Sequence, residues 1–190
     1  ERERTDMLSR RNVMISIHTS RRGISIPLFR LGGEAEPDDG ETPEDEEDMP
    51  DELPDWEEDS GDEPEQADLL MEGKLVTTSR RAELVYEESE LTGMEGAVTK
   101  ICFEQNSPGL VSMLRSGTVS TALVFEAGRR HICVYHTPFS CFEVCVQTLE
   151  VQNRLLEEGT LFLDYLIEIH GLRTEHCRMN LRICDAVPAP

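Results

Sequence analysis

From residue 69 onward, apolar side chains alternate with polar ones, and this alternation constrains the fold more than any other feature of the chain. A two-residue period places successive side chains on opposite faces of an extended strand. No segment in this part shows a convincing 3.6-residue period. The clearest rows of side chains that share one face are Phe142, Val144, Val146 and Thr148; Leu161, Leu163, Tyr165, Ile167 and Ile169; and Cys177, Met179, Leu181 and Ile183.

The number and spacing of these segments indicate the fold class. We count roughly eight to ten short strands joined by tight turns, which is typical of a meander that closes into a barrel or a sandwich. Short hairpin connections favour an up-and-down order over a Greek key. Residues 12–19 are rich in β-branched side chains and are expected to form the first strand. The sequence therefore predicts an all-β, antiparallel, up-and-down β-barrel.

The acidity of the chain is concentrated in one stretch. Residues 34–68 hold 20 of the 39 acidic residues and no Lys or Arg, which leaves 19 acids and 18 bases elsewhere. Such a segment cannot offset the entropy of ordering, so residues 32–68 are predicted to be a disordered insertion. Three roles remain open: attraction of a basic partner, solubility, or filler without a function. Trp56, the only tryptophan, is typical of a segment that folds when it docks on a partner.

Charge and apolar content also limit the function and location. A net charge of −21 argues against nonspecific binding to nucleic acid or to anionic membranes, because phosphate contacts need clustered cations. No apolar run approaches the roughly 20 residues of a membrane-spanning helix. Six cysteines without a signal peptide predict reduced thiols and a cytoplasmic location. The expected organisation is a disordered leader (1–11), a first strand with an edge segment (12–31), the acidic insertion (32–68), the remaining barrel (69–185) and a tail (186–190).

Several short motifs in the strand-rich part follow one another in an order that carries a resemblance. Residues 86–96 read Tyr-Glu-Glu-Ser-Glu-Leu-Thr-Gly-Met-Glu-Gly and are expected to connect two strands. With residues 113–117, 137–139, 159–161 and 164–165, they resemble the bacterial YwiB-like family, a domain of unknown function described as a calycin-like (lipocalin-like) β-barrel. The long insertion is where the chain departs from that family. The resemblance implies a fold and no settled activity, so it carries over no catalytic residue.

Arg115 is the most informative candidate for a binding residue. It shares a strand face with Val111 and Met113 and is expected to point inward, where an unpaired charge is costly. The expected carboxylate partners are Glu88, Glu90, Glu143 and Asp164. Two interpretations remain open: an anchor for an anionic ligand in the barrel mouth, or a structural ion pair that closes the barrel. The candidate ligand-binding residues are Tyr86, Arg115, His131, Tyr135, Glu143 and Tyr165.

The cysteines and histidines raise a metal hypothesis. If Thr137 lies opposite Cys141, the hairpin register places Tyr135 opposite Glu143, and Cys133 opposite Cys145 near His131. A site of two cysteines and a histidine is one interpretation, and reduced thiols that pack as small hydrophobes are the preferred one. The sequence therefore predicts neither a metal nor another cofactor.

No motif of an enzyme is present in the sequence. We find no nucleophile elbow, no HExxH pattern and no glycine loop that opens a helix. The carboxylates of residues 87–95 are expected to form a solvated hairpin end. The predicted function is that of a small non-catalytic barrel that binds a small molecule in its lumen. The alternative is an interaction or scaffold protein whose acidic segment around Trp56 engages a basic partner.

Overall fold

The computed structural model describes residues 8–24, 63–169 and 173–186, and these residues form ten strands. The strands are β1 (Ser9–Ile24), β2 (Glu65–Thr77), β3 (Arg81–Glu87), β4 (Val98–Glu104), β5 (Ser107–Ser116), β6 (Thr121–Glu126), β7 (Arg130–His136), β8 (Cys141–Arg154), β9 (Thr160–Ile169) and β10 (Arg173–Asp185). A 3-10 helix, η2 (Glu90–Thr92), follows β3. None of these ranges contains a helix that is long and apolar enough to cross a membrane. The predicted all-β fold is confirmed.

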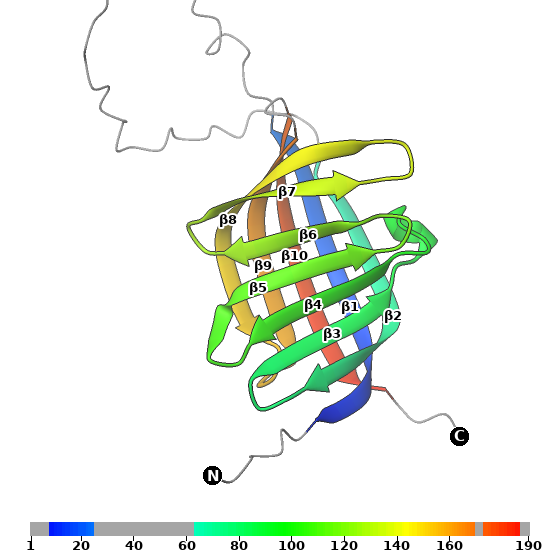
Figure 1. Ribbon diagram of the computed structural model, residues 1–190, viewed down its shortest axis with the longest axis vertical. Coiled ribbons are helices and arrows are strands. Elements are labelled where there is room, and N and C mark those ends of the chain that lie inside the picture. Colours follow the sequence, from blue (N-terminus) through cyan, green and yellow to red (C-terminus); the bar gives the residue numbers. More distant parts are fainter. Residues whose placement is uncertain (1–7, 25–62, 170–172, 187–190) are drawn as a thin grey trace, which may run out of the picture.

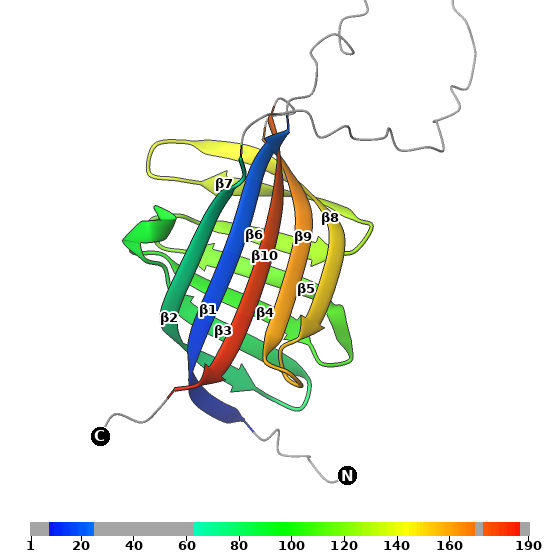
Figure 2. The same cartoon turned by 180° about the vertical axis from the view of Figure 1, so that it is seen from behind.

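The strands form one antiparallel sheet that curls into a nearly closed barrel. Their order is β6-β5-β4-β3-β2-β1-β10-β9-β8-β7, so each strand lies beside its neighbours in sequence and β1 lies beside β10. Figures 1 and 2 show β3 to β7 crossing one side of the barrel and β2, β1, β10, β9 and β8 forming the other. Between β6 and β7 the ladder shrinks to one bridge, Ser120 with His136. The up-and-down order predicted from the short turns is confirmed.

The alternating apolar residues point inward and fill most of the barrel. Val13, Ile15 and Ile17 of β1 are almost fully buried, as are their neighbours from the other strands. The largest fully buried side chains are Phe125, Ile15, Leu84, Ile101, Met113, Leu155, Leu161, Leu163, Leu181, Val13, Val111 and Val146. Burying one such side chain is worth roughly 1.5–3 kcal/mol, so these rows are the main source of stability.

The strands near the acidic stretch are longer than the sequence predicted. β1 begins at Ser9, so residues 9–11 belong to a strand and not to a disordered leader. β2 begins at Glu65, whereas residues 65–68 were expected in the insertion. The physical reason is pairing across strands: the β1–β2 ladder runs from Ser9↔Thr77 to Arg21↔Glu65 and satisfies the backbone groups of both ends. Residues 25–62, which include Trp56, lie outside the described residues.

Hydrogen exchange should distinguish β1 from the seam between β6 and β7. β1 is paired on both sides, with β2 and β10, so its amides should exchange only when the whole barrel unfolds. The β7 amides that face β6 should exchange at least about 100-fold faster, because local opening exposes them. Exchange followed by NMR would measure this, with β10 as the slow reference. Equally slow exchange along both edges of β7 would contradict the view that β6 and β7 are joined only weakly.

Candidate functional site

A cavity of about 460 Å³ opens at one end of the barrel. Its walls come from β1, β2, β3, β5, β9, β10 and the segment around η2. The lining residues are Ile17, Thr19, Arg21, Glu65, Gln66, Ala67, Leu69, Tyr86, Glu88, Leu91, Thr92, Met94, Met113, Arg115, Tyr165 and Met179. The lumen is therefore packed in its middle and hollow at this mouth. A hollow of this size is large enough to take a small ligand.

The segment that joins β3 to β4 forms one wall of the cavity. Gly93 ends η2 with φ 68°, a left-handed conformation that favours glycine, and its N–H donates to the carbonyl of Glu90. The N–H of Glu88 donates to the carbonyl of Ala97 at 2.9 Å, which closes the loop. The predicted connection between two strands is confirmed. The expectation of a solvated hairpin end is wrong at Glu88, which is only 7% exposed.

The buried carboxylate of Glu88 is the partner of Arg115. Nε of Arg115 lies 3.4 Å from Oε1 of Glu88, and the hydroxyl of Thr99 donates to the same oxygen. The side chains are 17% and 3% exposed, respectively. The expectation of an inward-facing arginine with a carboxylate partner is thus confirmed. Among the four carboxylates considered, period-two alternation favours this one, because Glu88 continues the inward row of Tyr86.

All three tyrosines of the chain surround Arg115. Burial lowers the pKa of Arg115, because it disfavours the charged guanidinium. The three tyrosines and Glu88 together raise this pKa by more, so it lies above its ordinary value. Burial also raises the pKa of Tyr86 and of Tyr165, so both phenols stay protonated and able to donate. The hydroxyl of Tyr135 lies 3.5 Å from the sulfur of Met94 on the loop wall. The structure therefore brings together four of the six candidate residues: Tyr86, Arg115 and Tyr165 line the cavity, and Tyr135 contacts its lining through Met94.

Several polar atoms at the cavity have unused hydrogen-bonding capacity. Among the described residues, none accepts a hydrogen bond from the two terminal amino groups of Arg115, whose side chain bonds only through Nε. The hydroxyl of Tyr165 makes no hydrogen bond to any described residue, and its ring packs edge-on against Phe125 with centroids 4.9 Å apart. Oε2 of Glu88 likewise receives no donor from these residues. Arg115, Tyr165 and Glu88 line the same cavity, so the unused donors and the unused acceptor belong to one site.

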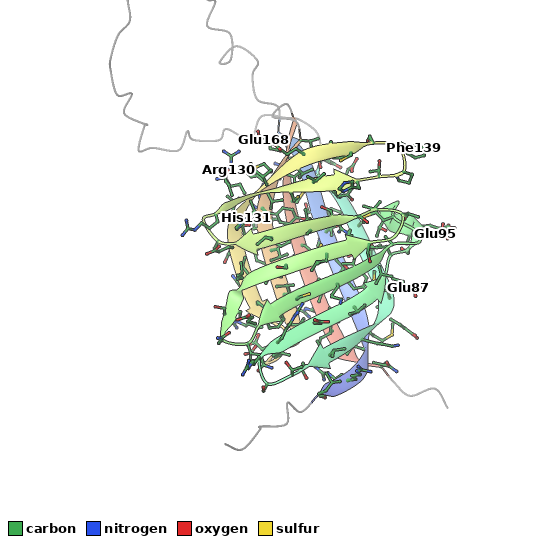
Figure 3. The ribbon with its side chains drawn as sticks, viewed as in Figure 1. Glu87, Glu95, Arg130, His131, Phe139 and Glu168 are labelled. Carbon is green, nitrogen blue, oxygen red and sulfur yellow. The ribbon has the colours of Figure 1, made fainter. Side chains whose placement is uncertain are left out.

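The remaining two candidates, His131 and Glu143, do not reach this cavity. His131 points inward on β7, but at the far side of the barrel from the loop with Glu95 (Figure 3). Its Nε2 lies 3.6 Å from Oε2 of Glu126. Glu143 is exposed and pairs with Val134 on the outer face, so the expectation that it could pair with the inward Arg115 is wrong.

The predicted register of the β7–β8 hairpin is wrong by one residue. The turn holds only Pro138 and Phe139, because the N–H of Thr137 donates to the carbonyl of Ser140 at 2.8 Å. Cys133 therefore pairs with Val144 and faces inward, while Cys145 pairs with Ile132 and faces outward. A shift of one residue moves a side chain to the opposite face of a sheet, so the two thiols do not meet.

Three further observations bear on the cysteines. In the ranges that the structure describes, no group of three His, Cys, Asp or Glu side chains is arranged to hold a metal ion. All six cysteines are free thiols. Cys145 receives a hydrogen bond from Nε of Arg130 at 3.4 Å, and Arg130 also pairs with Glu168 at 2.9 Å. These contacts join side chains on the outer face of the barrel, away from the cavity.

A comparison with protein families shows to which family the chain belongs. The family model described as "Domain of unknown function (DUF1934)" matches residues 56–181, which is more than half of the sequence. The chain belongs to this family. Every cavity residue outside β1 falls within the DUF1934 match. The crystal structure of the ywiB protein from Bacillus subtilis shares the fold, with a TM-score of 0.57 and 17% identity over 94% of each chain. No curated protein matches this sequence.

Proposed function

We propose that this barrel binds a small organic carboxylate in the mouth cavity, with Arg115 as the anchor. The observation that carries the proposal is the open end of the guanidinium, whose two terminal amino groups bond to none of the described residues. An arginine fork matches a carboxylate, which it binds through two parallel hydrogen bonds. The protonated hydroxyl of Tyr165 supplies a further donor. The lining mixes polar and apolar side chains, so it can bind a charged head group and still contact an apolar part of the same ligand.

The alternative is that the Arg115–Glu88 pair only closes the barrel. A pair with that role is expected to use both oxygens and the full fork, because a desolvated ion pair is favourable only when its geometry is good. The observed contact joins single atoms, Nε and Oε1, at 3.4 Å. The pair thus uses Nε, at the side of the guanidinium, and leaves the two terminal amino groups without an acceptor among the described residues. This geometry favours binding over a purely structural role.

The proposal is one of binding without chemical reaction, in a cytoplasmic protein. Among the described residues, the cavity lining contains no cysteine, histidine or serine, so it offers no thiol or serine hydroxyl beside a histidine base. The six free thiols agree with a reducing compartment.

Substitution of Arg115 by methionine tests the proposal. We expect 3-phenylpropanoate to shift the backbone NMR signals of the cavity residues in the unaltered protein. Its affinity should fall about 10- to 100-fold in Arg115→Met, because a hydrogen bond to a charged group is worth about 1.5–3 kcal/mol. Arg129→Met is the matched control, since Arg129 lies at the exposed β6–β7 turn. Equal affinity in the two variants would refute the anchor role.

Native mass spectrometry of protein purified from its own cells would identify the natural ligand. We expect a bound organic acid that Arg115→Met loses and that Arg129→Met keeps. Bound species of equal abundance in both variants would place the ligand outside this cavity.

A further inference from the structure

We propose that the carboxylate bound in this cavity also carries an ammonium group, so that the ligand is a zwitterion of the amino-acid type. This inference rests on the proposed function and narrows it to one chemical class. The observation behind it is the Arg115–Glu88 pair. Arg115 is cationic and has unused hydrogen-bond donors, and Glu88 is anionic and has an unused acceptor oxygen.

The charge balance of the lining favours a ligand of net charge zero. The cavity is lined by two arginines, Arg21 and Arg115, and two glutamates, Glu65 and Glu88. Arg21 also has a carboxylate near it outside this lining, because its Nε lies 3.7 Å from Oε2 of Glu175. A simple carboxylate would therefore add a negative charge beside a site that is already neutral. Repulsion by the nearly buried Glu88 would weaken its binding.

The two oxygens of Glu88 are unequally used. Oε1 accepts from both Thr99 and Arg115, whereas Oε2 receives no donor from any residue that the structure describes. A carboxylate that is buried without its full set of donors is costly, and an ammonium group brings three. The terminal amino groups of Arg115 and this oxygen belong to two side chains that are in direct contact through Nε and Oε1. An α-amino acid presents its ammonium and carboxylate with the same adjacency, since one carbon carries both.

The rest of the cavity indicates an apolar side chain on this ligand. Ile17, Leu69, Met113 and Met179 line the inner part, and methionines adapt to irregular shapes. A phosphate ester fits less well, because its second negative charge would need another unpaired arginine, and Arg21 already lies beside Glu175. The expected class is thus an apolar amino acid or a close analogue.

Matched pairs of probes test the ammonium group. Leucine would be compared with 4-methylpentanoate, methionine with 4-(methylthio)butanoate, and phenylalanine with 3-phenylpropanoate, by NMR titration of the full chain. We expect at least one amino acid to bind 10-fold or more tightly than its partner without the amino group. N-acetylation of that amino acid should remove the advantage.

The outcomes separate this inference from the proposed function. If the simple acids bind as tightly as the amino acids and Arg115→Met weakens both, the zwitterion inference falls and the carboxylate site stands. If no probe of either series binds in the cavity, both fall. Glu88→Gln should lower the affinity for the amino acid to that of its simple acid, while the simple acid keeps its affinity or gains. An equal loss of affinity for the amino acid and for the simple acid would show that Glu88 has only a structural role. The comparison with the N-acetylated amino acid tests the ammonium group without the Glu88→Gln variant.

Discussion

Glu88→Gln is expected to lower the free energy of unfolding by about 3 kcal/mol, because it leaves the charge of Arg115 without its carboxylate inside the barrel. We place the effect at the lower end of the usual range, since Arg115 still reaches the water of the cavity. Urea denaturation would measure the change. Glu87→Gln is the matched control: Glu87 is the neighbouring, exposed residue, and its replacement should alter stability by less than about 0.5 kcal/mol.

A double variant separates the charge from the fold. Glu88→Leu combined with Arg115→Met replaces the pair by apolar side chains, which is often neutral or stabilising. We therefore expect the double variant to recover most of the stability that Glu88→Gln loses, while it loses carboxylate binding. Equal instability of the single and double variants would contradict the view that the unpaired charge causes the loss.

Gly117→Ala is expected to destabilise the barrel by at least about 3 kcal/mol, through strain and collision together. Gly117 has φ 124°, which L side chains rarely adopt. A Cβ there would collide with the carbonyl oxygen of Gly96 and lie 3.0 Å from Cα of Ala97. Both are backbone atoms of the β3–β4 loop and cannot rotate away. The variant should thus shift the wall that carries Glu88.

Thermal and urea unfolding would check this effect, with Gly109→Ala as the control. A Cβ on Gly109 would meet nothing within 4 Å, so its replacement should change stability by less than about 0.5 kcal/mol. Similar melting of the two variants would mean that the β3–β4 loop can move away from Gly117.

The fold could be predicted from the sequence because the two-residue period repeats along the chain. The period-two rows of residues 142–148, 161–169 and 177–183 decide which faces are buried, and the short turns decide which strands are neighbours. The ends of β1 and β2 were harder to predict from the sequence. Residues 9–11 and 65–68 are polar except for Ala67, and their pairing across strands keeps them extended.

The residues of the site could be predicted only where they follow the same two-residue alternation. Arg115, Tyr86 and Tyr165 lie on inward rows, and so does Glu88 once the row of Tyr86 is continued beyond the strand. Glu143 was misplaced because an assumed turn of three residues set it opposite Tyr135, whereas the turn of two residues pairs it with Val134 on the outer face. Which end of the lumen stays hollow depends on side-chain volumes at three-dimensional contacts, and no period in the sequence records it.

The pairing of β1 with β10 sets a condition on biosynthesis. Arg11 and Asp185, which form an ion pair at 2.9 Å, are separated by 174 positions. A ribosome must therefore deliver nearly the whole described chain before β1 finds its second neighbour, and the early strands wait with an open edge. Contacts this distant slow folding. Nascent chains that stop before β10 should stay sensitive to protease, and resistance should arise in one late step rather than strand by strand.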